Sequence, residues 1–432
     1  MSRRETIPQA HPGRAGSGIG TVTTTGGRSL VARGRNAREY ADAAWSRLHS
    51  GERGPILVTL GLVALWLVFY GLNQNFLSPR NLSNISVDIV GTGLVAVGIV
   101  FVLLIGEIDL SVGSVSGLAG ATFAVLNVSL GMPEWLAVIV AVASGMVVGA
   151  VHGFFFARVG IPAFVVTLAG LLAWNGLTLH LLGTGGTIDI DEGGLVAALT
   201  SYYFGATSAA YSLAALGSAA YFLASYRSAK RRRTAGIPYR PLGEILVRTG
   251  VLAGIGFTAA YVVNQFQGLP LALLIFLVVL VGSDYVLRRT CYGRKIFAVG
   301  SGAEAARRAG VNIVRLRISM FIVSGTLAAI GGLFVASGLT SASPTTSRAA
   351  GSGMLLINAV AAAVIGCTSL FGGRGSPWSA LLGVLVIQSL ASGMAFLGVE
   401  DSVQFMIIGA VLLAAVATDS LARRSQGTRD RA

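Results

Sequence analysis

Apolar runs of about 20 residues recur along most of this 432-residue chain, and they limit its fold more than any other feature. A helix needs roughly 20 consecutive apolar residues to cross the hydrocarbon core of a bilayer. Only helices and closed barrels satisfy their backbone hydrogen bonds inside a bilayer, and the two-residue alternation typical of barrel strands is absent from this sequence. We therefore predict an all-α polytopic membrane protein with about 10–12 transmembrane helices.

Twelve segments are candidate spans. Several of them are short or interrupted by glycine, which is typical of half-helices, so we expect some broken helices. The candidates are 55–72, 84–105, 115–131, 134–157, 162–182, 203–225, 247–266, 269–287, 318–338, 354–371, 377–397 and 402–418. An even number of spans places both ends of the chain on the same side of the membrane.

The charged residues support this class of protein. They make up only 12% of the chain, against about 25% in soluble domains, which excludes an ordinary soluble enzyme. The net charge of +14 could suggest a nucleic-acid partner, but most Lys and Arg residues fall in separate segments at 1–53, 227–248, 288–317 and 421–432. Such clusters beside apolar spans are typical of cytoplasmic loops, whereas nucleic-acid binding needs one contiguous basic face. We expect cytoplasmic termini and no nucleic-acid partner.

Composition also sets the limits of the membrane domain. Residues 1–53 are rich in Arg, Ser, Thr and Gly without an apolar period, so we predict a disordered basic cytoplasmic tail there. The transmembrane domain then covers 54–422, and 423–432 form a short cytoplasmic tail. Two cysteines, Cys291 and Cys367, exclude a disulfide scaffold and a multi-cysteine metal site.

The sharpest motif places two carboxylates, Glu107 and Asp109, directly after a long apolar run. Carboxylates next to a membrane segment are costly and usually face an interior or an aqueous surface. Gly106 and Gly113 allow a broken helix or a tight turn. Two interpretations stay open: a helix break that lines a pathway or contacts a cytoplasmic partner, and an ordinary polar loop.

A second motif predicts a short charged helix. Ser301, followed three residues later by Glu304, is a capping box, and Gly310 is a suitable C-terminal stop. Glu304 can pair with Arg307 or Arg308 at i+3 and i+4. So short a helix has little reason to be stable alone. We therefore favour docking on another protein over a solvated loop helix.

A third motif, at 366–377, separates two candidate spans, and Pro377 suits the first turn of the helix that follows. We interpret it as a structural turn. A weak internal repeat relates 105–113 to 365–373 at a constant offset of 260 residues. Paired halves of this kind are common in transporters.

Six polar residues lie inside candidate spans. Each could line a sugar-sized polar path, and each could equally join helices by hydrogen bonds, which is the commoner role. They are Asn127, Asn175, His180, Asn264, Asn358 and Gln388. His152 and His180 lack the neighbouring ligands of a metal site. The sequence contains no GxxxxGK[ST], HExxH or GxSxG motif, which argues against ATP binding by this chain and against an enzyme.

Four ordered motifs resemble those of permease subunits of ATP-binding-cassette (ABC) sugar importers of the ribose, xylose and arabinose type. The resemblance covers about residues 55–422, and the motifs are Glu107–Ser114, Pro162–Gly170, Phe297–Asn312 and Thr368–Gly373. The xylose-transport type is similar in a further respect, because the resemblance implies an added pair of spans at 203–266 around the basic segment Lys230–Arg233. One departure is Leu356-Ile357-Asn358, where the family usually has Glu-Leu-Asp.

The resemblance implies an importer permease fold over 54–422, without catalysis of its own, in a bacterial plasma membrane. It implies a cytoplasmic coupling loop at 288–317 and three groups of site residues. Those for ATPase coupling are Ser301, Glu304, Ala305, Arg307, Arg308 and Gly310; those of the signature or pathway are Glu107, Asp109, Ser111, Gly113, Gly372 and Gly373; those of the substrate pathway are Asn127, Asn175, His180, Asn358 and Gln388.

The implied partners are a second permease subunit (identical or a homologue), a cytoplasmic ATP-binding subunit, an extracytoplasmic sugar-binding protein and membrane lipid. ATP and Mg would bind to the partner ATPase, and this chain would hold no cofactor and no metal. Two other classes remain as alternatives. An ion-coupled secondary carrier would use Glu107 or Asp109, and a membrane enzyme would act on lipid-linked substrates.

Overall fold

The computed structural model describes residues 54–183, 186–237, 239–342 and 354–429. The predicted tail at 1–53 lies outside the described residues, as do 430–432 of the predicted C-terminal tail. Residues 423–429 of that tail continue the last helix.

Helices dominate the first half of the described chain. In order they are α2 (Gly54–Leu72), η1 (Gln74–Leu77), α3 (Pro79–Leu104), α4 (Val112–Ala124), η2 (Val125–Ser129), α5 (Glu134–Phe154), η3 (Phe155–Val159), α6 (Ala163–Leu182), α7 (Leu195–Ser201), α8 (Thr207–Thr234) and α9 (Leu242–Asn264). Two-residue strands lie between them, β1 (Ile188–Asp189) before α7 and β2 (Tyr203–Phe204) after it.

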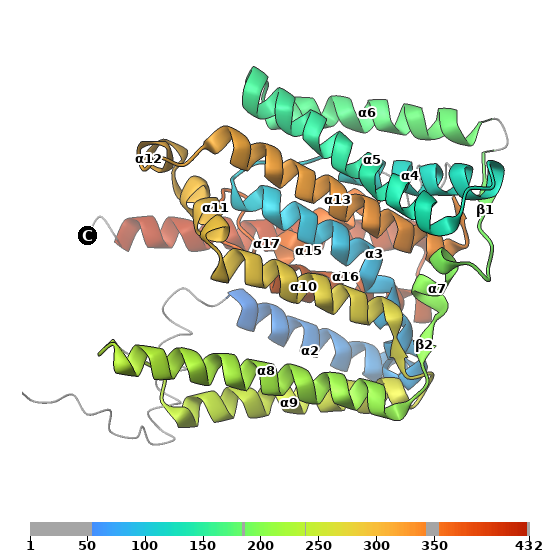
Figure 1. Ribbon diagram of the computed structural model, residues 1–432. Coiled ribbons are helices and arrows are strands. Elements are labelled where there is room, and N and C mark those ends of the chain that lie inside the picture. Colours follow the sequence, from blue (N-terminus) through green and yellow to red (C-terminus); the bar gives the residue numbers. More distant parts are fainter. Residues whose placement is uncertain (1–53, 184–185, 238, 343–353, 430–432) are drawn as a thin grey trace, which may run out of the picture. The chain divides into compact units, whose positions relative to one another are not determined.

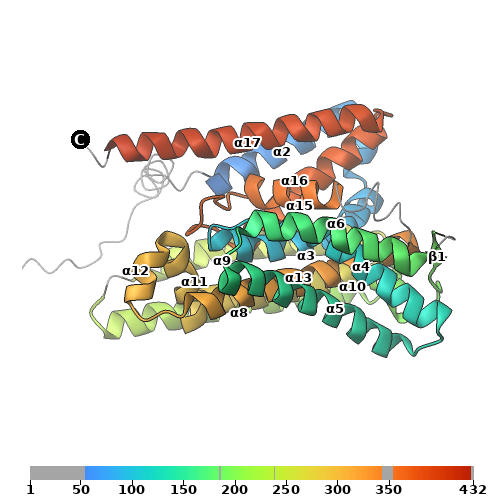
Figure 2. The same cartoon turned by 90° about the horizontal axis from the view of Figure 1, so that it is seen from above.

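The second half begins with the strand β3 (Leu269–Pro270). It continues with α10 (Leu271–Arg289), α11 (Cys291–Ser301), α12 (Ala303–Arg308), α13 (Ile313–Leu339), β4 (Ser341–Ala342), α15 (Leu356–Ile365), α16 (Pro377–Phe396) and α17 (Asp401–Arg429). The start of α2, the short helix α12 and the end of α17 all lie at the left of Figure 1, and the strands lie at the right. The start of α2 and the end of α17 therefore lie at the same end of the helix bundle (Figure 1 and Figure 2).

The predicted polytopic helical fold is confirmed. Eight helices of the described chain are long and apolar enough to cross a membrane, and three shorter apolar helices cover Ile56–Leu72, Leu356–Ile365 and Ser402–Ala417. With α8, each of the twelve candidate spans corresponds to a helix. Within the described ranges, the only exceptions to the all-α fold are four two-residue strands, which form two antiparallel pairs, β1 with β4 and β2 with β3.

Two candidate spans differ from the structure. The span predicted at 203–225 starts late, because Tyr203 and Phe204 pair with β3. It also continues to Thr234 through several arginines, and α8 is not among the helices apolar enough to cross a membrane unaided. The span predicted at 354–371 is a half-helix, since α15 ends at Ile365 and a turn follows.

The core is built around α13, which packs against α3, α4 and α5. Glycines allow the closest approach: a Cβ on Gly149 of α5 would lie 2.2 Å from the carbonyl oxygen of Phe321 on α13. In membrane helices small residues permit such tight contacts. By contrast α8 and α9 pack chiefly against each other and run side by side in Figure 1; that 203–266 is an added pair of spans stays a prediction.

Candidate functional site

The three sequence motifs meet in space although they are far apart in the chain. The backbone N–H of Gly373, in the loop between α15 and α16, donates to the carbonyl oxygen of Leu104 at the end of α3, at 2.9 Å. Gly300, at the end of α11, packs into the same place. A Cβ there would lie 1.9 Å from Leu104 O and 2.6 Å from Gly373 N. We refer to this backbone-to-backbone contact of Leu104–Gly106, Gly300–Ser301 and Phe371–Gly373 as the loop junction.

The glycines of the loop junction are required by conformation as well as by space. Gly106, Gly372 and Gly373 have φ values of 81°, 84° and 73°, in the left-handed region that favours glycine. A Cβ on Gly372 would approach both Gly106 N and Gly300 O to 2.9 Å. The two halves of the weak internal repeat therefore lie against each other, and the structural interpretation of the turn at 366–377 agrees with the geometry.

The predicted charged helix exists as α12, but its predicted N-cap is wrong. Ser301 is the last residue of α11, and its hydroxyl donates to Phe297 O at 2.8 Å. Gly302 is the N-cap of α12 and offers no side chain to it. The capping box fails because α11 continues up to Ser301, so the serine hydroxyl faces back along its own helix.

The C-terminal end of α12 agrees with the sequence. Gly310 has a φ of 83°; its N–H donates to Arg307 O at 3.0 Å, and Val311 N–H donates to Ala306 O at 3.1 Å. These two bonds form a Schellman motif. The chain then turns directly into α13, whose N-cap Asn312 accepts from Arg315 N at 3.0 Å.

The side chains of α12 present a charged outer face. Glu304 pairs with Arg307 at 2.9 Å and with Arg308 at 3.6 Å, as predicted. All three are well exposed, like Ala305, whereas Ala306 is buried against the rest of the chain. Exposed pairs contribute little to stability, so these pairs do little to hold α12 in place.

Asp109 is the centre of a buried hydrogen-bond network. It is only 3% exposed, in the break between α3 and α4. Its Oδ1 accepts from Ser111 N at 3.0 Å and from Ser111 Oγ at 2.6 Å, and its Oδ2 accepts from Ser324 Oγ on α13 at 2.9 Å. Residues 105–111 form a non-helical segment between the two spans Pro79–Leu104 and Val112–Ser129, and this carboxylate is turned into the protein. Whether the segment lines a pathway or only joins the two spans stays a prediction.

The network continues to α5 and α6. His152 Nδ1 lies 3.2 Å from Ser111 Oγ, and Trp174 Nε1 donates to His152 Nε2 at 2.9 Å. Since an indole N–H can only donate, Nε2 must accept, which places the proton of a neutral ring on Nδ1, facing Ser111. Sequence reasoning weighed His152 only as a metal ligand and missed this role; a lone histidine in an apolar run was its only signal.

Trp174→Phe tests this network. A smaller phenyl ring replaces the indole, and the buried His152 loses the donor to its Nε2, so we expect the unfolding free energy to fall by about 1–2 kcal/mol. Thermal unfolding of the detergent-purified chain measures the effect. Trp135→Phe is the matched control, because Trp135 is exposed; equal shifts for both variants would contradict the role of the hydrogen bond.

Glu107 is held differently, at the surface of the same loop. Its carboxylate lies 3.4 Å from the guanidinium of Arg317, on α13, and Arg317 also stacks over the ring of Phe156 at 4.6 Å from its centre. Partial burial raises the pKa of the Glu107 carboxyl above its ordinary value, and the charge of Arg317 offsets part of that rise. Helix α13 thus contacts both carboxylates of the motif.

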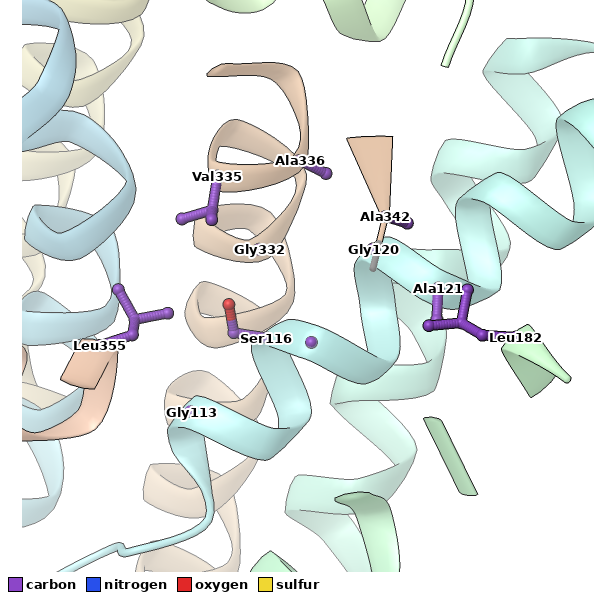
Figure 3. Close-up of a pocket in the computed structure, with 11 residues that line it drawn as sticks. Gly113, Ser116, Gly120, Ala121, Leu182, Gly332, Val335, Ala336, Ala342 and Leu355 are labelled. Atoms are coloured by element: carbon purple, nitrogen blue, oxygen red, sulfur yellow. The ribbon is translucent and has the colours of Figure 1, made fainter. Parts of the chain in front are cut away.

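A small crevice lies further along α4 and α13 (Figure 3). Most of the residues that line it are small: Gly113, Ser116, Gly117, Gly120 and Ala121 of α4, Gly332 and Ala336 of α13, and Ala342. Val335 of α13, Leu182 and Leu355 complete its walls. Its water-accessible volume is about 20 Å³, enough for about one water molecule. A sugar does not fit in this conformation.

The polar residues predicted for a pathway are scattered, and in the described chain they do not line this crevice. Some join neighbouring segments: Asn127 donates to Met132 O at 3.0 Å, Asn264 to Thr207 O at 3.0 Å, and Gln388 to Asp88 Oδ2 at 3.2 Å. His180 is exposed on α6, and Asn175 is half-buried there. The side-chain oxygen of Asn358 is buried without a hydrogen-bond partner in the described chain.

Comparisons with known proteins match most of the chain to permease components of transport systems, in agreement with the sequence motifs. Residues 81–416 match the family described as branched-chain amino acid transport system / permease component. The xylose transport system permease protein of Escherichia coli strain K12 is 36% identical over 381 residues, which cover 88% of this chain and 95% of that protein. Its Haemophilus influenzae counterpart is 32% identical over 367 residues, 84% of this chain and 96% of that protein.

A ribose relative is also similar. The ribose import permease protein of Bacillus subtilis is 30% identical over 360 residues, which cover 83% of this chain and 91% of that protein. No solved structure matches. The sequence motifs, the helical fold and these matches agree, and the chain belongs to the family of branched-chain amino acid transport system permease components.

Proposed function

We propose that this chain is the membrane-spanning permease subunit of an ABC importer that moves a monosaccharide, xylose or a related sugar, into the cell. The observation that carries the proposal is the course of α13. This one helix starts directly after the exposed helix α12, holds Glu107 through Arg317 and Asp109 through Ser324, and ends along the crevice at Gly332–Ala336. The names of the relatives supply the class of substrate.

In this proposal the outer face of α12 binds a cytoplasmic ATP-binding subunit. That partner holds and hydrolyses ATP with Mg, and this chain binds no cofactor. A displacement of α12 reaches the α3–α4 break by two routes, through the loop junction at Gly300 and through α13. Rigid-body movement of packed helices is a common form of such switching.

The proposed transport path runs along the α4–α13 crevice. Because its present volume is about 20 Å³, passage of a sugar requires α4 and α13 to separate. A second permease subunit, a copy or a homologue, would complete the path. A sugar-binding protein would deliver its ligand at the end that carries β1–β4, and both termini would be cytoplasmic, on the side of α12.

Uptake of radiolabelled xylose and ribose by cells with and without this chain tests the proposal. Depletion of ATP is expected to stop uptake, whereas collapse of the ion gradients with ionophores at constant ATP is expected to leave it. The reverse pattern would favour a secondary carrier, and product formation by the purified chain alone would favour an enzyme.

Reversing two charges on the outer face of α12 tests its docking role. In Arg307→Glu/Arg308→Glu we expect uptake to fall at least about tenfold, since several interfacial like-charge contacts cost a few kcal/mol, while the unfolding midpoint stays unchanged because both side chains are exposed. Arg231→Glu/Arg233→Glu, at the exposed end of α8, is the matched control. Wild-type uptake by the α12 variant would contradict the docking role.

A further inference from the structure

The end of α8 carries a concentration of positive charge that the transport proposal does not use. From Arg227 to Arg240 the chain has six basic residues, and it has no acidic residue anywhere between Glu192 and Glu244. Helix α8 has 28 residues, so at 1.5 Å per residue it is about 42 Å long. That exceeds the hydrocarbon thickness of about 30 Å, so the arginine-rich end reaches the level of the lipid headgroups.

Part of this positive charge lines a cavity that is formed by three separate segments of the chain. Arg232 of α8, Arg240 of the α8–α9 loop and Arg289 at the end of α10 line one cavity together with Ser225, Ser228 and Ala229. Its water-accessible volume is about 210 Å³, ten times that of the α4–α13 crevice. Arg289 is 57 positions from Arg232 in the sequence, so only the tertiary structure brings it here. We refer to this cavity as the arginine groove.

The three arginines of the groove have no acidic partner in the described part of the chain. The two nearest acids in sequence are already engaged on their own helices: Glu244 pairs with Arg248 at 2.8 Å, and Asp284 pairs with Arg288 at 2.6 Å. Three guanidinium groups and two serine hydroxyls around one cavity can donate many hydrogen bonds but can accept few. Such a donor set suits an anion, and guanidinium groups match phosphate oxygens in pairs.

Aromatic residues place the groove at the membrane surface. Three exposed tyrosines lie near these arginines: Tyr226 on α8, Tyr239 in the α8–α9 loop and Tyr285 on α10. Each lies within four positions of an arginine in the sequence. Exposed tyrosines gather at the level of the lipid headgroups in membrane proteins. The anion available at that level is the phosphate of an anionic phospholipid, and basic residues near a membrane attract such lipids.

We propose that the arginine groove binds the phosphate-bearing headgroup of an anionic phospholipid at the side of the membrane where α12 lies. The lipid would fill the outer edge of the α8–α9 pair, which packs weakly on the rest of the protein. The site involves neither the loop junction nor the crevice, so it stands whether or not the chain transports a sugar.

Titration of the detergent-purified full chain with fluorescently labelled phosphatidylglycerol tests the site. In Arg232→Gln/Arg240→Gln/Arg289→Gln we expect the dissociation constant to rise about a hundredfold, because each arginine near a membrane anion contributes close to a fivefold factor. The control Arg227→Gln/Arg231→Gln/Arg233→Gln removes the same charge outside the groove, and we expect a change of about twofold. Equal losses in both triple variants would overturn the site in favour of general charge attraction.

Two further binding measurements distinguish an anionic lipid from other phosphate-bearing ligands. Labelled phosphatidylcholine, which has a phosphate but no net charge, is expected to bind at least about tenfold more weakly, and equal binding would overturn the anionic preference. Millimolar inorganic phosphate is expected not to displace the lipid; full displacement would assign the groove to a soluble phosphate compound instead. The single variant Arg289→Gln, expected to weaken binding about fivefold, repeats the test with the least change to α8.

Discussion

Gly300→Ala is expected to abolish uptake almost completely, although it adds a single methyl group. Gly300 lies inside α11, where alanine is intrinsically the better helix former by about 1 kcal/mol, so local helix propensity predicts a gain in stability. The loop junction predicts the opposite. The added Cβ would lie 1.9 Å from Leu104 O and 2.6 Å from Gly373 N, and both of these are backbone atoms that cannot rotate away.

The methyl group therefore has to push α11 away from the end of α3. Overpacking of this kind typically costs 1–3 kcal/mol and sometimes more, and a contact with two backbone segments belongs at the upper end. A loss of about 3 kcal/mol corresponds to roughly a hundredfold change in an equilibrium between conformations. We expect uptake at or near background, with a lowered unfolding midpoint of the purified chain.

Gly302→Ala is the matched control for this variant. Gly302 lies two positions further along the chain, between α11 and α12, and has extended backbone with a φ of 176°. The nearest neighbour of its added Cβ would be Ala305 Cβ, at 3.9 Å. We expect uptake within about twofold of the wild type, since surface changes away from special contacts usually stay within about 0.5 kcal/mol. Normal uptake by Gly300→Ala would show that the loop junction does not couple α11 to the α3–α4 break.

Asp109→Ala is expected to have the second largest effect. The substitution leaves three buried donors without their acceptor, the N–H and hydroxyl of Ser111 and the hydroxyl of Ser324. Each unsatisfied buried group costs about 1–3 kcal/mol. We expect the unfolding free energy to fall by about 3 kcal/mol or more, and uptake to be lost, because α4 and α13 lose the contact that ties them to the break.

Asp109→Asn separates the hydrogen bonds from the charge. The amide oxygen can still accept from Ser111, and the amide N–H₂ can donate to Ser324, whose hydroxyl can turn to accept. We expect this variant to keep most of the stability that Asp109→Ala loses while uptake is impaired. If the alanine variant unfolds at the wild-type midpoint, the network around Asp109 carries no stability. If uptake by the asparagine variant equals that of the wild type, the segment is only a connector.

Much of the fold follows from local chemistry and could be predicted. Spans such as 134–157 and 377–397 are long, apolar and bounded by Pro, Gly or charge, so their helices follow from the cost of placing backbone polar groups in lipid. The end of α12 at Gly310 was predictable for a different local reason, because the left-handed backbone there favours glycine. The predicted start was wrong because Ser301 satisfies its own helix instead of capping the next one, a choice set by the residues before it.

The features of the candidate sites also divide into those that follow from local sequence and those that need the tertiary structure. From the sequence alone come the membrane class, an interruption between spans at Glu107–Asp109 and the charged pairs of α12, because hydropathy, glycine conformation and i, i+4 spacing act within a few residues. Only the tertiary structure decides that Gly300 meets Gly373, that Ser324 and His152 reach Asp109 and its serine, and that Arg289 joins Arg232 and Arg240. These contacts join residues 40 to more than 200 positions apart, and their geometry depends on how whole helices pack.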